Sequence, residues 1–189
     1  VETMGGTTPA YEFVKAALLK GKHVVTSNKA LVAAHGTELL RIAREKKVNF
    51  FFEAAVGGGI PVIRTLGTGY QGQVITEITG ILNGTTNYIL TRMDREGAEF
   101  GDVLADAQRL GYAERNPEAD IEGHDTCRKI AILSSLVTGK EVNFEDVYTE
   151  GISKIDSTDF RYASELRASI KLVGSAQFAG DQVTVSVFP

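Results

Sequence analysis

The first fifty residues alternate between short apolar runs and amphipathic stretches. Apolar residues three and four positions apart predict a helix that follows Thr8-Pro9 and ends at Gly21. Thr8 is expected to be the N-cap of this helix, and Pro9 its first residue, because a hydroxyl followed by proline is a favoured helix start. The residues expected on its buried face are Ala10, Phe13, Val14, Ala17 and Leu18.

A longer helix is predicted between two short apolar runs, at residues 23–26 and 48–52. Ser27 or Asn28 can cap it, and its apolar face would use Leu31, Val32, Leu39, Leu40 and Ile42. Helices alternating with strands through short links are typical of a parallel α/β sheet. A doubly wound domain normally has more strands than this. We therefore interpret residues 1–54 as the C-terminal half of a Rossmann-type dinucleotide-binding domain.

After residue 54 the pattern changes. A glycine-rich turn at 54–60 precedes a short helix that Pro61 opens and a strand at 74–81. Three helices are predicted at 86–95, 100–110 and 123–138. The tail predicts a strand, a helix and two strands, at 168–178 and 182–188, joined by a hairpin turn at Gly180-Asp181. The expected fold class is thus α/β followed by α+β, with a mixed-sheet domain and its helices over residues 55–189.

Composition narrows the partners and the location. The 189 residues are 43% hydrophobic and 23% charged, with a net charge of −4, which argues against nucleic acid or an anionic membrane as the partner. Cys127 is the single cysteine, so we expect no internal disulfide and a reducing, cytoplasmic environment. No run of about eighteen apolar residues predicts a membrane span.

The segment with the most candidate chemistry is AQRLGYAERNPEADIEGHDTCRK, at residues 107–129. Glu114, Asp120 and Asp125 supply carboxylates and Lys129 supplies an amine, around a loop between two helices. A small zwitterionic substrate would need carboxylates for its ammonium group and a proton donor for its reacting oxygen. The alternative is an ordinary solvated ion pair between residues 125 and 129, beside a plain turn at Asn116-Pro117. Spacing alone does not decide between these interpretations.

The same segment resembles the defining motif of the homoserine dehydrogenase family. Its fixed positions are matched by Ala107, Gly111, Tyr112, Ala113, Asn116, Pro117, Asp120, Ile121, Gly123, Asp125 and Lys129. Further stretches are also similar to the family: VVTSNKALVA at 24–33, EAAVGGGIPVIRTL at 53–66, GILNGTTNYILTRM at 80–93 and EGISKI at 150–155. The resemblance extends over essentially the whole chain.

This resemblance implies NAD- or NADP-dependent interconversion of L-homoserine and L-aspartate 4-semialdehyde, in threonine, methionine and isoleucine biosynthesis. It implies that Lys129 is the catalytic proton donor and acceptor, assisted by Asp125, and that Glu114, Asp120 and Asp125 hold the substrate. It also implies that Lys29 contacts cofactor or substrate, and that Gly111 approaches the nicotinamide.

The resemblance further implies a sodium ion and a homodimer formed through the sheet of the second domain. The sodium ligands would be the side chain of Glu53 and the backbone carbonyls of Val56, Gly58 and Ile60, which are hard oxygen donors. From the residues alone, the glycines at 57–59 predict a helix start that needs backbone freedom. No G-x-G-x-x-G turn follows a first strand here. We therefore expect the 189 residues alone to bind NAD(P) weakly and to be inactive.

Three alternatives remain. The chain could be a non-catalytic dimerisation module with an inherited pocket. It could be another dehydrogenase, of the aspartate-semialdehyde or saccharopine type, but the thiol nucleophile of the former would have to be Cys127, which lies mid-helix with no base placed beside it. Metal catalysis is disfavoured because His23, His35 and His124 lack ligand spacing.

Overall fold

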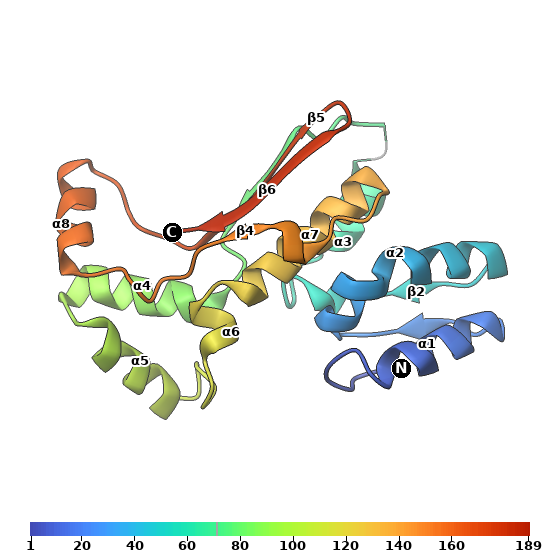
Figure 1. Cartoon of the computed structure of the whole chain (residues 1–189), viewed down its shortest axis with the longest axis horizontal. Coiled ribbons are helices and arrows are strands. Elements are labelled where there is room, and N and C mark those ends of the chain that lie inside the picture. Colours follow the sequence, from blue (N-terminus) through green and yellow to red (C-terminus); the bar gives the residue numbers. More distant parts are fainter. Residues whose placement is uncertain (71) are drawn as a thin grey trace. The chain divides into compact units, whose positions relative to one another are not determined.

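The computed structural model describes residues 1–70 and 72–189 (Figure 1). The chain divides into two compact units. The first unit consists of Val1–Thr76, Arg128–Asp146 and Phe178–Gly180, and the second of Glu77–Cys127, Val147–Gln177 and Asp181–Pro189.

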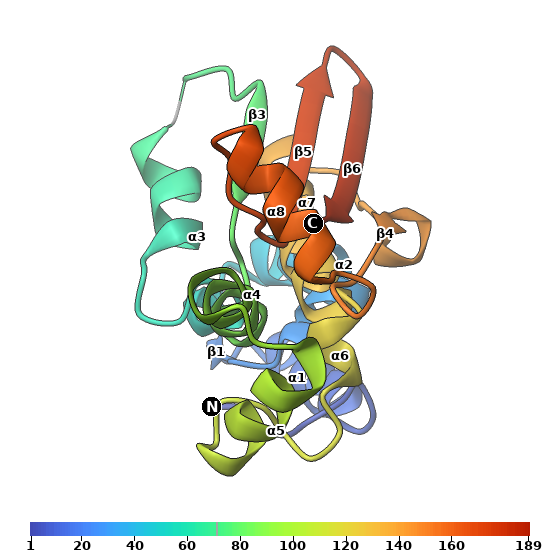
Figure 2. The same ribbon diagram turned by 90° about the vertical axis from the view of Figure 1, so that its left-hand side faces the viewer.

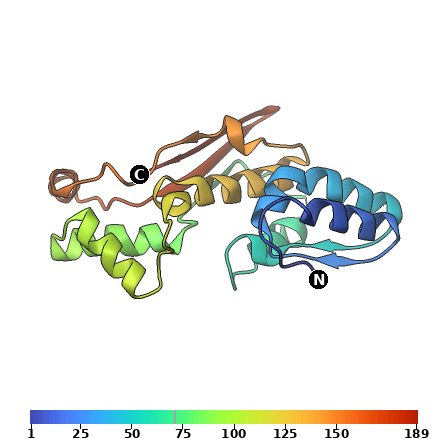
Figure 3. The same ribbon diagram turned by 60° about the horizontal axis from the view of Figure 1, so that its bottom comes forward.

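The first unit is built on a small parallel sheet. Strands β1 (Val24–Val25) and β2 (Phe50–Phe51) pair in parallel, and Glu2 forms a further parallel bridge to Thr26. Helices α1 (Ala10–Leu19) and α2 (Lys29–Lys46) lie side by side over one face of these strands (Figure 3). One side chain of each strand is accordingly buried, while Val25 and Phe51 on the other face are 47% and 55% exposed. The predicted parallel α/β arrangement is confirmed.

The two helices begin differently. Asn28 caps α2 as predicted, and its Oδ1 accepts the N–H of Leu31 at 3.1 Å. The predicted Thr8 cap of α1 is wrong. No side chain caps this helix, and it begins at Ala10, after Pro9. The backbone carbonyls of Thr7 and Pro9 accept the N–H groups of Tyr11 and Phe13 instead.

The buried face of α1 is narrower than predicted. Ala10, Val14 and Leu18 are buried, and they lie four residues apart along a single stripe. Phe13 lies about 100° around the helix from Val14, and its side chain is 61% exposed. Its predicted place in the core is therefore wrong.

A glycine-rich turn leads from β2 into a short helical segment. The 3₁₀ turn Glu53–Ala55 is followed by α3 (Val62–Arg64), which continues as a π-helical turn over Thr65–Gly69. The two carboxylate oxygens of Glu53 accept the N–H groups of Ile63 and Arg64, each at 2.9 Å. Glu53 thus supplies acceptors for N–H groups at the start of α3. The sequence predicted that this helix opens at Pro61, and it begins at Val62.

The second unit contains the mixed sheet. Its strands lie in the order β3 (Glu77–Gly80), β5 (Val173–Ala179), β6 (Gln182–Phe188) and β4 (Tyr148–Thr149), as Figure 2 shows. β3 is antiparallel to β5, whereas β4 is parallel to β6. The predicted hairpin turn joins β5 to β6, and Gly180 adopts the left-handed conformation there (φ 61°).

Helices complete the second unit. The three predicted helices are present as α4 (Gly84–Glu96), α5 (Phe100–Arg109) and α7 (His124–Thr138), and α7 passes from the second unit into the first after Cys127. α4 contacts α5, α8 (Ser157–Glu165) and a short helix, α6 (Glu118–Ile121). The sequence had predicted a loop where α6 lies. Within residues 1–70 and 72–189, no helix is both long enough and apolar enough for a membrane span.

Candidate active site

The first unit contains a pocket of about 430 Å³ that brings two of the predicted site residues together. Lys29 lines it as the first residue of α2, and Lys129 lines it from α7. The other lining residues are mostly small, and four of them are glycines, at positions 5, 6, 57 and 58. Both lysines are half-buried. The pocket therefore combines two amines with walls of small residues.

The start of α2 adds to the positive character of this pocket. Asn28 accepts a hydrogen bond from one of the first N–H groups of the helix. The N-terminal end of a helix carries a partial positive charge. Two lysines beside a helix N-terminus favour ligands with anionic or electron-rich oxygen atoms.

A buried carboxylate anchors the loop that forms one wall of the pocket. Glu2 is 6% exposed and accepts hydrogen bonds from the hydroxyl of Thr26 and the backbone N–H of Met4, both at 2.5 Å. Asn28 Nδ2 donates to the carbonyl of Gly6 at 2.7 Å. These bonds tie residues 2–6 to β1 and to the start of α2. Glu2 was not predicted from the sequence, although an acidic residue beside an apolar segment was a usable signal.

In the second unit, one amide joins two of the predicted substrate ligands. Nδ2 of Asn83 donates to Oδ1 of Asp120 at 2.7 Å and to Oδ2 of Asp125 at 3.0 Å. Asp125 is 2% exposed and Asp120 is half-buried. An ordinary solvated helix pair is therefore excluded for Asp125. Asn83 was missed because it lies 37 and 42 residues before its partners in the sequence.

Comparison with known proteins identifies the family. A family model described as homoserine dehydrogenase matches residues 61–189, and one described as the NAD-binding domain of homoserine dehydrogenase matches residues 1–53. The chain belongs to the homoserine dehydrogenase family.

Individual relatives agree. The homoserine dehydrogenase of Neisseria gonorrhoeae is 48% identical over 189 residues, which is the whole of this chain and 43% of that protein. A crystal structure of a homoserine dehydrogenase from Thiobacillus denitrificans is 49% identical with a TM-score of 0.95, over all of this chain and 44% of the other. A hyperthermophilic archaeal homoserine dehydrogenase in complex with NADPH is 31% identical with a TM-score of 0.83, over 99% of this chain and 55% of the other. The chain thus spans less than half the length of the curated relative quoted.

Two other residues of the homoserine dehydrogenase motif lie on the surface of the second unit. Gly111 ends α5 with a left-handed conformation (φ 79°), and its N–H donates to the carbonyl of Gln108. Glu114 is exposed, and its backbone carbonyl accepts a hydrogen bond from Gln108 Nε2 at 3.1 Å. The cofactor role of Gly111 and the substrate role of Glu114 stay predictions.

The turn predicted to hold sodium in homoserine dehydrogenases has oxygen donors that already accept hydrogen bonds. Both oxygens of Glu53 accept N–H groups of α3, and the carbonyl of Ile60 accepts the N–H of Val62 at 2.8 Å. Each of these oxygens retains a second lone pair, so the donor set is compatible with a hard cation. Among the residues that the structure describes, no three His, Cys, Asp or Glu side chains cluster as metal ligands. A cation here would therefore be held by the single carboxylate of Glu53 together with the carbonyls of Val56, Gly58 and Ile60.

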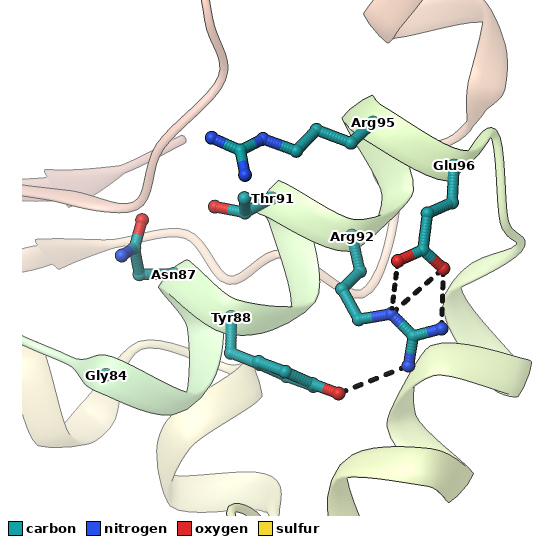
Figure 4. A pocket seen from close by; sticks show the side chains of 7 residues that line it. All are labelled: Gly84, Asn87, Tyr88, Thr91, Arg92, Arg95 and Glu96. Carbon is teal, nitrogen blue, oxygen red and sulfur yellow. Dashed lines mark hydrogen bonds and ion pairs between the residues drawn. The ribbon is translucent and has the colours of Figure 1, made fainter.

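A further cavity, of about 400 Å³, follows one face of α4 (Figure 4). Arg92 dominates it and donates to the carboxylate of Glu96 and to the hydroxyl of Tyr88. Arg92 also reaches Asp106 on α5 at 3.0 Å. No residue of the predicted site lines this cavity, and its polar groups connect two helices of the unit.

Proposed function

We propose that this chain supplies the substrate-binding and proton-transfer part of an NAD(P)-dependent homoserine dehydrogenase. The reaction is the reversible interconversion of L-homoserine and L-aspartate 4-semialdehyde. The observation that carries the proposal is the pocket of the first unit, where Lys29 and Lys129 meet in a member of this family. The nicotinamide cofactor supplies and accepts the hydride when it is bound, and the protein contributes position and proton transfer.

Lys129 handles the proton in this proposal. During reduction, its ammonium Nζ donates a proton to the alkoxide oxygen that forms from the aldehyde. During oxidation, its amine takes that proton back from the hydroxyl group. Asp125 precedes it by one turn of α7, which supports a shared substrate for the two side chains. The carboxylates of Asp120, Asp125 and Glu114 bind the ammonium group of the amino acid.

The residues of the first unit fit a nicotinamide cofactor. Lys29 and the N-terminus of α2 suit its anionic and polar oxygens. A Cβ at Gly5 or Gly6 would meet no protein atom within 4 Å, so their backbone borders open space that a ligand can approach closely. The family motif adds Gly111 to the residues proposed to bind the cofactor. NADP is the cofactor we propose, supported by the NADPH complex of the archaeal relative.

We propose a homodimer formed through the four-stranded sheet. Tyr148 on β4 and Phe188 on β6 are 63% and 41% exposed. Tyr148 pairs with Ser186, which points to the same face of β6 as Phe188. Exposed aromatic side chains on strands are typical of interfaces. Sedimentation of the full-length protein should give a dimer, and a monomer at high concentration would contradict this proposal.

The finer assignments are proposals as well. Residues 1–54 would belong to the dinucleotide-binding domain and 55–189 to the substrate and dimerisation domain, and the family-model limits at 53 and 61 support this boundary. The enzyme would act in threonine, methionine and isoleucine biosynthesis, in the cytoplasm, where the buried thiol of Cys127 remains reduced. Sodium at Glu53 would make activity higher in sodium salts than in tetramethylammonium salts, and equal rates would argue against this ion.

The central test replaces Lys129 with Ala in the full-length protein. We expect kcat for homoserine oxidation to fall about 10²- to 10⁴-fold, with a much smaller change in KM, because general acid–base groups contribute in this range. Equal losses in kcat and in homoserine affinity would remove Lys129 from the catalytic role. Calorimetry showing that the wild-type protein does not bind homoserine would favour a non-catalytic dimerisation module.

A further inference from the structure

We propose that Asn83 is a positioning residue for substrate recognition, holding Asp120 and Asp125 as a joint receptor for the substrate's ammonium group. This inference rests on the proposed function, because that function supplies the ammonium. Asn83 acts through the two carboxylates to which it donates.

The orientation of the Asn83 amide is fixed by helix α4. Asn83 is the N-cap of that helix, and its Oδ1 accepts the N–H of Thr86 at 2.8 Å and the hydroxyl of Thr86 at 3.1 Å. The carbonyl oxygen of the amide is therefore held by hydrogen bonds from the first turn of the helix. The NH₂ end consequently faces the opposite way, toward the segment 120–125.

The two hydrogens of this NH₂ group match its two acceptors. An amide nitrogen carries two N–H donors, and one oxygen each of Asp120 and Asp125 lies within 3.0 Å of it. Asn83 is 5% exposed, so these bonds are shielded from water. A hydrogen bond to a charged acceptor is stronger than one between neutral groups, and more so away from solvent.

The Asn83 amide fixes the positions of the two carboxylates without adding a charge of its own. One oxygen of each carboxylate lies within 3.0 Å of the same nitrogen, so both carboxylates lie on the same side of the start of α4. A primary ammonium group offers three N–H donors to carboxylate oxygens, which fits the ammonium that the proposed function supplies.

The two functions of Asn83 can be separated by substitution. Asn83→Ser keeps an oxygen that can cap α4 but replaces the two N–H donors by one hydroxyl on a shorter side chain, which cannot bind both carboxylates at once. Asn83→Asp also keeps the cap but adds a third carboxylate. Asp156→Ala is the matched control, because Asp156 caps α8 in the same unit and touches no residue of the predicted site.

The experiment measures binding to the full-length protein with NADP, by calorimetry, for homoserine and for 4-hydroxybutanoate, its analogue without the amino group. We expect Asn83→Ser to weaken homoserine binding about tenfold, Asn83→Asp to weaken it more, and both to leave the analogue's affinity unchanged. Asp156→Ala should lower Tm without changing either affinity. Equal losses for both ligands, or an unchanged homoserine affinity in Asn83→Ser, would overturn the proposal.

Failure of the proposed function looks different. In that case the wild-type protein itself binds no homoserine. Crystal structures of the wild type and Asn83→Ser then still test the positioning role, because the carboxylates of Asp120 and Asp125 should move apart in the variant. Unchanged carboxylate positions would overturn it.

Discussion

Lys29 and Lys129 line one pocket, although they come from helices that are far apart in the sequence. Their surroundings differ. Lys29 stands at the first position of α2, at the end of the helix that carries a partial positive charge, whereas Lys129 lies in the interior of α7. This difference predicts separate roles for the two amines.

We expect Lys29→Gln to raise the KM of the cofactor about tenfold or more while lowering kcat less, because it removes a charge next to a helix N-terminus that favours anionic groups. Steady-state kinetics of the full-length protein would measure both parameters. Lys22→Gln, at an exposed position of the same unit, is the control and should leave them unchanged. A Lys29 variant with a normal cofactor KM would place this lysine outside the cofactor site.

Leu18 and Phe13 on α1 should respond differently to truncation. Leu18 is fully buried, so Leu18→Ala should destabilise the protein by about 2–5 kcal/mol through lost burial and a residual cavity. Phe13 is 61% exposed, and Phe13→Ala should change the free energy of unfolding by about 0.5 kcal/mol or less. Urea unfolding of the two variants would compare them directly. A large loss for Phe13→Ala would mean that a partner surface covers this side chain.

Gly151 lies where no side chain can fit. A Cβ there would overlap the carbonyl of Ile121 and approach Cα of Glu122 to 2.5 Å, and both are backbone atoms next to Asp120. We expect Gly151→Ala to cost about 1–3 kcal/mol and to raise the homoserine KM, because the backbone of α6 has to shift. Thermal unfolding and kinetics would be measured together.

Gly101 provides the comparison for this substitution. A Cβ at Gly101 would meet nothing within 4 Å, and Gly101 lies inside helix α5. Gly101→Ala should therefore leave KM unchanged and raise Tm slightly, since alanine favours the helix. Equal Tm values for the two alanine variants would contradict the overlap at Gly151.

The ion pairs of α4 and α5, one of which joins the two helices, should make stability depend on acid pH. Hydrogen bonds from Arg92 hold the pKa of Glu96 below its usual value, and hydrogen bonds from Arg109 and then Arg92 do the same for Asp106. A carboxyl with a lowered pKa in the folded state stabilises that state at neutral pH, and this contribution is lost as the pH falls through the lowered pKa. Glu96 and Asp106 are solvent-accessible, so the effect is modest.

Replacing Arg92 with Met should therefore lower Tm at pH 7 and flatten its decline between about pH 5 and pH 2. Calorimetric scans across this range would test the prediction. The control is Arg41→Met, which removes an exposed pair with Glu45 on α2. An Arg92 variant with the same pH profile as the wild type would show that these ion pairs do not contribute to stability.

Strong apolar periodicity explains why most elements could be predicted. α5 and α7 carry buried residues three and four positions apart, such as Val103 with Ala107 and Ile130 with Leu133, and their observed ends lie within one residue of the predicted ones. The four residues of α6 are too few to show a period. The end of α1 was found correctly from Gly21, but its start was not, since backbone carbonyls replaced the expected hydroxyl cap.

The candidate site was only partly predictable, because some of its residues act through contacts between distant segments. The motif at 107–129 contained both aspartates and the lysine. The motif could not predict that Asn83, the N-cap of α4, donates to both aspartates. Those hydrogen bonds depend on how α4 packs against α6. Glu2 likewise gains its role from Thr26 and Asn28, which lie between β1 and α2, more than twenty residues later in the sequence.

The continuity of α7 from Asp125 to Lys129 has a consequence for the proposed substrate site. A helix rises about 1.5 Å per residue, so the two α-carbons stay about 6 Å apart for as long as this turn is intact. Loop movement cannot alter that separation. Under the proposed function, the lengths of these two side chains therefore limit the size of the amino acid that both can contact, and a single inserted residue between them would turn one about 100° away from the other.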